Sequence, residues 1–157
     1  MPSRNDYVQL DGLNNALLVA ALRQHYNGAA WENVLGNQEI TAFPAATRSA
    51  TAVSPDFTNA NFRGVMVFLN ITAASGTGGL TLRVEGKDPV GGGYFALHAA
   101  PAAVVATGLQ VYALYPGVSG GAVSQPTQII LPRTWRVRVV HGDATNYTYS
   151  VGASMAV

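Results

Sequence analysis

Strict alternation of apolar and polar residues near the C-terminus constrains this chain more than any other feature. Residues 131–143 read LPRTWRVRVVHGD, in which Trp135, Val137 and Val139 alternate with a threonine and two arginines. Successive side chains of a β-strand point to opposite faces, so the pattern predicts a strand with one buried and one solvated face. A proline before the run and a Gly-Asp pair after it mark its two ends. Such a strand belongs in a sheet that covers a core on one side.

Similar short segments recur through most of the chain. Residues 64–73 (GVMVFLNITA) form the most hydrophobic one, and apolar residues on both of its faces predict cover on both sides. Glycine and proline breakers separate the segments at intervals of about ten residues. The pattern favours a mostly-β fold, an antiparallel β-sandwich or jelly roll of about seven strands. The expected strands are residues 48–54, 64–73, 80–85, 94–98, 109–115, 134–140 and 147–155.

The beginning of the chain differs from the rest, so we expect an N-terminal segment over residues 1–46 and a β-sandwich domain over residues 47–157. Asp11 is a suitable N-cap, residues 13–26 favour a short helix, and a following Asn-Gly pair is a suitable stop. The apolar residues run almost all the way round this helix, so it would pack on two sides or against a neighbour. Two adjacent asparagines weaken the helix, and residues 11–28 are alternatively an extended arm.

Charged residues make up only 11% of the 157 residues, against about 25% in an average soluble domain. So low a charge is unusual for a free monomer and indicates a surface buried against copies of the chain or another protein. A net charge of +1 without a concentrated basic patch argues against a nucleic-acid partner. The apolar run at residues 16–22 is too short to span a membrane. The chain has no cysteine, which excludes disulfides and cysteine nucleophiles.

Three groups of residues resemble the sequence motif of a chemical site but lack the neighbouring residues or the spacing that such a site requires. Residues 117–121 (GVSGG) match G-x-S-x-G, but a proline-containing loop follows instead of the helix that a nucleophile elbow requires. The glycine-rich residues 75–79 lack the Lys-Ser/Thr pair of a phosphate-binding loop. His98, His141 and Asp143 do not have the spacing of metal ligands. We therefore expect no enzymatic activity, no cofactor and no metal site.

The charged side chains of the alternating segments are expected on the outward faces of their strands. Glu85 lies two residues from both Arg83 and Lys87, which predicts an ion-pair ladder on a solvated face. Arg83, Arg136 and Arg138 are then outward-facing cations on a chain that is otherwise short of charge. They are the best candidates for contacts with an acidic neighbour.

Six short motifs are spread over the predicted sandwich domain. They are EGKDP at 85–89, GY at 93–94, YPG at 115–117, LPRTWRVRV at 131–139, HGD at 141–143 and YSVGA at 149–153. Together they resemble a family of small virion structural proteins of tailed bacteriophages, the head-decoration proteins that stabilise capsids. The resemblance covers about residues 47–157, and the first 46 residues match nothing in it. It supplies no catalytic residues.

The resemblance implies a β-rich oligomer, often a homotrimer, on the outside of an icosahedral shell, with the major capsid protein as its partner. Such a protein binds the assembled shell and not its separated parts, and so stabilises the shell by mass action. We expect subunit contacts from the strand at residues 64–73 and from the N-terminal segment. The predicted interface residues are Leu17, Leu18, Leu22, Met66, Phe68, Arg83, Arg136 and Arg138.

Two alternatives stay open at this point. A tail-tube or baseplate component would use the same kind of sandwich but would form rings or pack along the tail. A carbohydrate- or receptor-binding module would need several aromatic side chains exposed on one face. Tyr147 and Tyr149 share a face of their strand, although packing in a core or interface is the default for such residues.

Overall fold

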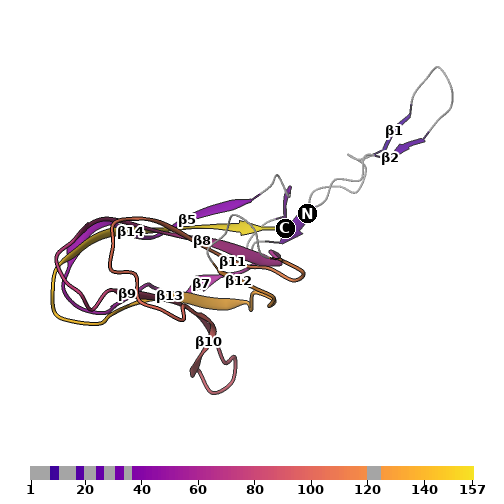
Figure 1. Cartoon of the computed structure of the whole chain (residues 1–157). Coiled ribbons are helices and arrows are strands. Elements are labelled where there is room, and N and C mark those ends of the chain that lie inside the picture. Colours follow the sequence, from indigo (N-terminus) through magenta and orange to yellow (C-terminus); the bar gives the residue numbers. More distant parts are fainter. Residues whose placement is uncertain (1–7, 11–16, 20–23, 27–30, 34–36, 120–124) are drawn as a thin grey trace. The chain divides into compact units, whose positions relative to one another are not determined.

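The computed structural model describes residues 8–10, 17–19, 24–26, 31–33, 37–119 and 125–157, and these residues are all-β without a helix (Figure 1). The chain divides into two compact units, Met1–Leu35 and Gly36–Val157. The second unit holds two five-stranded sheets. The prediction of a mostly-β, sandwich-like fold is therefore confirmed, with more strands than the seven expected.

The first sheet has the strand order β12-β11-β8-β14-β5. Strand β12 runs parallel to β11, and all other neighbours in this sheet are antiparallel. The long strands β8 and β14 lie at its centre because their inward residues are continuously apolar. The bounds are β5 (Gln38–Arg48), β8 (Gly64–Ala74), β11 (Gly108–Leu114), β12 (Gln125–Thr127) and β14 (Tyr147–Ala156).

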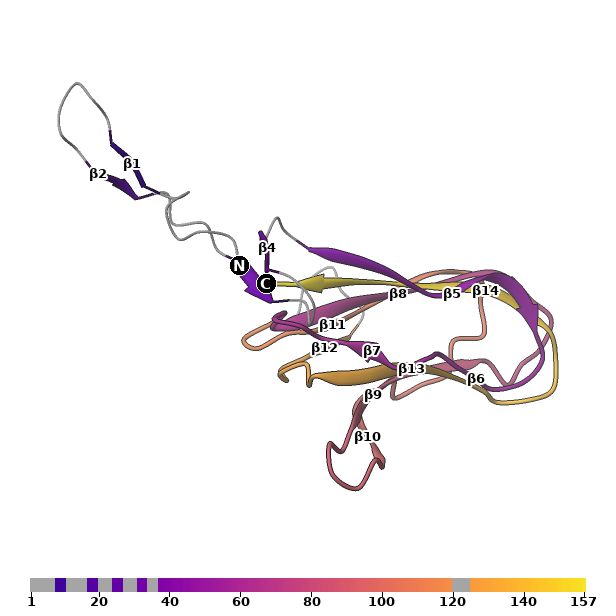
Figure 2. The same cartoon turned by 180° about the vertical axis from the view of Figure 1, so that it is seen from behind.

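The second sheet has the order β10-β9-β13-β6, and β7 also pairs with β13. All of its pairs are antiparallel. Both views show the two sheets as layers that face each other, with the β10 hairpin extending away from the second layer (Figure 2). The bounds are β6 (Ala52–Val53), β7 (Phe57–Thr58), β9 (Leu80–Lys87), β10 (Tyr94–Ala99) and β13 (Thr134–His141).

The core lies between the two layers and is filled by the apolar halves of the alternating strands. Trp135, Val137 and Val139 are fully buried, as their spacing predicted. The indole of Trp135 packs against the ring of Phe57, with the ring centroids 5.0 Å apart. The largest fully buried side chains are Trp135, Tyr112, Tyr147, Tyr149, Leu69, Ile71, Leu80, Leu82, Leu114, Met155, Val65 and Val67.

Within this chain strand β8 is fully buried on one face only, so the described residues do not supply the predicted cover on its second face. Its inward residues from Val65 to Ile71 are at most 1% exposed. Met66 and Phe68 point to the opposite face and are half-buried. The outer face of a sandwich sheet has no second layer of the same chain to cover it, which the composition of a single strand does not reveal.

The described residues of the N-terminal unit form two antiparallel strand pairs. Strand β1 (Val8–Leu10) pairs with β2 (Leu17–Val19), and β3 (Gln24–Tyr26) pairs with β4 (Trp31–Asn33). The helix predicted over residues 13–26 is therefore wrong wherever this stretch is described. Its apolar residues did not form a single stripe, so a helix had no one face to bury, whereas paired strands satisfy their backbone groups with each other.

The sandwich begins earlier than the predicted boundary between residues 46 and 47. Strand β5 starts at Gln38 and pairs with β14 along most of its length. The register shifts between Tyr149, which pairs with Ala46, and Val151, which pairs with Phe43, so the intervening Pro44 falls in the bulge. The strand predicted at residues 48–54 is correspondingly only the short β6.

Candidate functional site

The outer face of β9 and β13 holds a compact group of charged side chains, Arg83, Glu85, Arg136 and Arg138, which we call the arginine cluster. Its members are cross-strand neighbours: Arg136 is paired with Glu85, and Arg138 is paired with Arg83. Arg136 Nε donates to Glu85 Oε2 at 2.7 Å, and Arg138 Nη1 lies 3.7 Å from Glu85 Oε1. Both oxygens of the one carboxylate are therefore occupied by β13.

Glu85 does not form the predicted ladder with Arg83 and Lys87. It is only 6% exposed, although it is on the outward side of its strand. Lys87 instead donates to Asp56 at 2.8 Å. The prediction was wrong because it paired residues along one strand, whereas the sheet places the partners of Glu85 directly opposite on β13.

A second network flanks the arginine cluster. Asp56 accepts a hydrogen bond from the Tyr94 hydroxyl at 2.7 Å in addition to the one from Lys87. The Lys87 ammonium first, and then the Tyr94 hydroxyl, hold the pKa of Asp56 below its usual value. The guanidinium carbon of Arg136 lies 3.2 Å from the centroid of the Tyr94 ring, so cation–π stacking joins the two networks.

Arg83 is the cation of this face that has no acidic partner among the described residues. The Nε atoms of Arg83 and Arg138 are both buried and have no hydrogen-bond partner in the described structure. Buried donors in native structures are almost always paired, so two such atoms in neighbouring side chains require an explanation. The predicted cations Arg83, Arg136 and Arg138 therefore lie together, and the single carboxylate of Glu85 compensates only one of their three positive charges.

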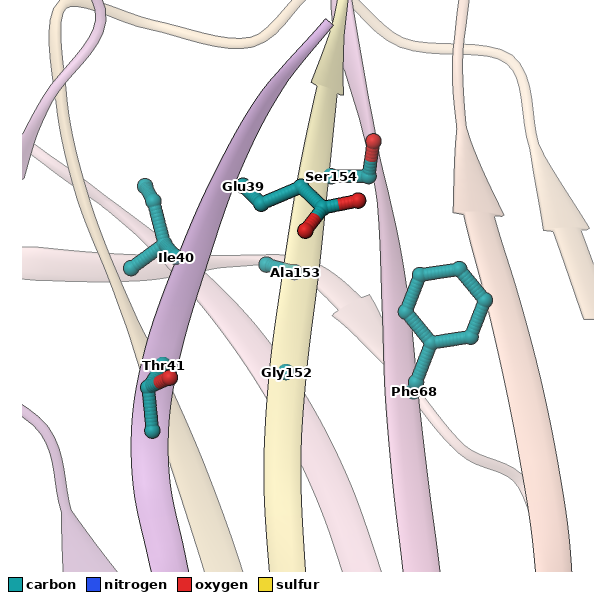
Figure 3. Close-up of a pocket in the computed structure, with 7 residues that line it drawn as sticks. All are labelled: Glu39, Ile40, Thr41, Phe68, Gly152, Ala153 and Ser154. Carbon is teal, nitrogen blue, oxygen red and sulfur yellow. The ribbon is translucent and has the colours of Figure 1, made fainter.

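The outer face of the other sheet carries a shallow groove that polar and apolar side chains line together. It lies over Gly152 of β14, where the lack of a side chain leaves a depression between Phe68 of β8 and Thr41 of β5 (Figure 3). The groove has a volume of about 310 Å³ and is open to solvent. Its lining residues are Glu39, Ile40, Thr41, Phe68, Gly152, Ala153 and Ser154.

The predicted interface residues of the two units fall in different places. Met66 and Phe68 are neighbours on the outer face of β8, and Phe68 lines the groove. Leu17 and Leu18 lie in strand β2, where they pair with β1. Leu22 lies outside the described residues.

His98 and His141 pack against aromatic rings and lie near hydroxyl groups. His98 is buried, its Nδ1 lies 2.7 Å from Thr127 Oγ1, and burial lowers its pKa. His141 packs against the rings of Tyr147 and Tyr149, and burial is the main cause of its lowered pKa. Among the described residues no group of three or more His, Asp or Glu side chains could hold a metal ion.

Asp143 organises the turn that follows β13. Its carboxylate accepts hydrogen bonds from the backbone N–H of Gly78 at 2.7 Å and of Thr145 at 3.0 Å, and from the Thr145 hydroxyl. These bonds, chiefly the one from the hydroxyl, lower the pKa of Asp143. The carboxylate is thus committed to joining two loops, the glycine-rich residues 75–79 and the turn after β13.

Tyr147 and Tyr149 are both fully buried, so they do not form the exposed aromatic platform that a carbohydrate site would need. Their shared face is the inner face of the sheet. The G-x-S-x-G match extends into residues 120–124, which lie outside the described part of the chain. The described residues also include no helix with the length and hydrophobicity that crossing a bilayer requires.

Comparison with protein-family models, with curated proteins and with solved structures finds no match to this chain. The candidate functional features of the sandwich are therefore on its two outer surfaces, the arginine cluster on one and the groove over Gly152 on the other. Sequence reasoning missed Asp56, Tyr94 and Gly152, because each gains its position from residues far away in the chain. Only the alternation of the strands signalled which side chains would face outward.

Proposed function

We propose that this protein is a non-enzymatic virion structural protein that binds the outside of a phage capsid and stabilises it as a homo-oligomer. The observation that carries the proposal is the apolar pair Met66 and Phe68 on the outer face of β8, where both are half-buried beside the groove over Gly152. Apolar surface left on one face of a sheet favours association, since burying it gains about 25 cal/mol per Å².

The composition supports the same proposal. With 11% charged residues the chain has little of the charge that keeps a free monomer soluble. The well-packed core shows that the sandwich does not need its outer apolar residues for its own interior. Those residues are therefore available for contacts between copies and with the major capsid protein. The resemblance of residues 47–157 to head-decoration proteins points to the capsid surface as the location.

The test compares shells of the parent phage prepared with and without the purified protein. We expect the protein to be a trimer by light scattering at micromolar concentration, to sediment with the shells and to raise their melting temperature. A monomer that leaves the shells unbound would contradict the proposal. Labelling that located the protein along the tail would instead favour a tail-tube or baseplate component.

A matched pair of variants connects the test to the groove. A Cβ at Gly152 would meet only the Ile40 carbonyl oxygen at 3.8 Å, so Gly152→Leu fills the groove without disturbing the core. Gly93 in the β10 hairpin has no atom within 4 Å of such a Cβ, and Gly93→Leu is the control. We expect the first variant to lose oligomerisation or shell binding while the second keeps both. Equal behaviour of the two variants would exclude the groove as the contact surface.

A further inference from the structure

We propose that Arg83 and Arg138 form a binding site for carboxylate side chains of a partner protein, on the outer face of the β9–β13 pair. The site is distinct from the groove over Gly152, which lies on the other sheet. It does not depend on whether the partner is a capsid, because any protein segment with accessible carboxylates would be recognised by the same charge. Its occupant is an acidic segment of another protein.

The charges of the arginine cluster do not balance. Arg83, Arg136 and Arg138 carry three positive charges around the single carboxylate of Glu85. That carboxylate accepts a hydrogen bond from Arg136 at 2.7 Å, and its other oxygen is 3.7 Å from Arg138. No described carboxylate forms an ion pair with Arg83. The cluster therefore keeps an excess of positive charge that the described fold does not neutralise.

The excess positive charge lies on facing residues of neighbouring strands. Arg83 and Arg138 are directly opposite each other in the register of β9 and β13. Like charges at such a position destabilise a sheet, and the buried Nε atoms of both side chains add two donors without an acceptor. A carboxylate bound between the two guanidinium groups would remove the repulsion, and guanidinium forks match carboxylates in geometry.

The site can be reached from solvent in part. The side chain of Arg138 is 38% exposed, although its Nε is buried. Beside it lies Val53 of the short edge strand β6, which is paired with Arg138 and is 45% exposed. An uncovered apolar side chain next to a cationic pair suits a protein surface, which offers carboxylates together with apolar contacts.

The surroundings favour a protein partner over a nucleic acid. A nucleic acid is bound by cations that follow several successive phosphates. Here the flanking cations are already paired, Lys87 with Asp56 at 2.8 Å and Arg136 with Glu85 at 2.7 Å. The excess of two positive charges is confined to the arginine cluster, which matches one or two carboxylates.

The test uses the full-length protein and a hexaglutamate peptide, with hexaglutamine as the uncharged probe. Binding is followed by NMR of the arginine Nε–Hε signals at low and moderate salt. We expect hexaglutamate to shift the signals of Arg83 and Arg138, and hexaglutamine to leave them unchanged. Arg83→Gln should weaken binding by about tenfold, as expected for the loss of one charge-assisted contact. Arg133→Gln, which alters an exposed arginine outside the cluster, should change it less than about twofold.

Three results would overturn the proposal. The first is hexaglutamate that leaves both signals unchanged at millimolar concentration. The second is an Arg83→Gln variant, folded by circular dichroism, that binds as tightly as the parent protein. The third is tighter, Arg83-dependent binding of inorganic tripolyphosphate or oligothymidylate, which would assign the site to phosphates. Because none of these measurements involves a capsid, their outcome is separate from that of the shell-binding test.

Discussion

Replacing Glu85 by glutamine tests whether the arginine cluster is organised as the structure indicates. The substitution keeps the volume of the side chain and removes its charge. Arg83, Arg136 and Arg138 would then share the outer face of β9 and β13 without a carboxylate between them. We expect Glu85→Gln to destabilise the protein, and Arg83→Gln to leave its stability unchanged or to raise it.

The expected magnitude follows from burial and distance. Hydrogen bonds to charged groups contribute about 1.5–3 kcal/mol, whereas exposed ion pairs contribute less than about 1 kcal/mol. The Glu85 and Arg136 side chains are 8% and 20% exposed and their bond is 2.7 Å, so this pair belongs near the middle of the higher range. The contact with Arg138 is 3.7 Å long and that side chain is 38% exposed, so solvent screens it and it adds little. The predicted loss is about 2 kcal/mol.

Urea unfolding followed by circular dichroism measures this loss. With a slope of about 2 kcal/mol per molar urea, the midpoint of Glu85→Gln should fall by about 1 M. The double variant with Arg83→Gln should be less destabilised than Glu85→Gln alone, because it removes a repulsion that the first change intensifies. A midpoint of Glu85→Gln equal to that of the parent would refute the reasoning. So would an Arg83→Gln variant as unstable as Glu85→Gln.

Three further predictions concern the core and the loops. Trp135→Ala should lower the free energy of unfolding by about 3–5 kcal/mol in urea, because the indole is fully buried; a loss below about 1 kcal/mol would contradict the packing. Burial lowers the pKa of His98 and His141 from about 6.5, so the unfolded chain takes up protons first and stability should decrease as the pH falls below this value. His98→Gln should make the free energy of unfolding fall less steeply between pH 7 and pH 5. An unchanged slope would show that His98 does not contribute to this decrease. Gly76→Ala would press its Cβ against a threonine side chain and should lower the free energy of unfolding by about 1–3 kcal/mol in thermal unfolding. Gly93→Ala places its Cβ in open space and should leave the stability unchanged.

The alternation of apolar residues was sufficient to predict the central strands. Strands β9 and β13 were expected at residues 80–85 and 134–140, and the structure places them at Leu80–Lys87 and Thr134–His141. In each, the apolar residues face the core as predicted, because burial of one face selects the period of two. Strand β5 escaped prediction because it is an edge strand with a bulge, where few side chains are buried and proline is tolerated.

The arginine cluster could be predicted only in part from the local sequence. That Arg83, Arg136 and Arg138 would face outward followed from their spacing, and all three lie on the outer side of their strands. Their pairing did not follow, because the register of β13 against β9 decides which charges meet. Glu85 was expected among its neighbours in sequence and is instead held by two arginines more than fifty residues later.

The sequence by itself determined the fold class, the central strands and the direction in which their side chains point, since these depend on periodicity within a few residues. Only the tertiary structure decided which strands are neighbours, and therefore that Gly152 lies beside Phe68 and that Arg83 lies opposite Arg138. The reason is that sheet pairing joins segments far apart in the chain, and the free energy that selects a register comes from burial of the whole face. Both candidate surfaces of this protein are products of that selection.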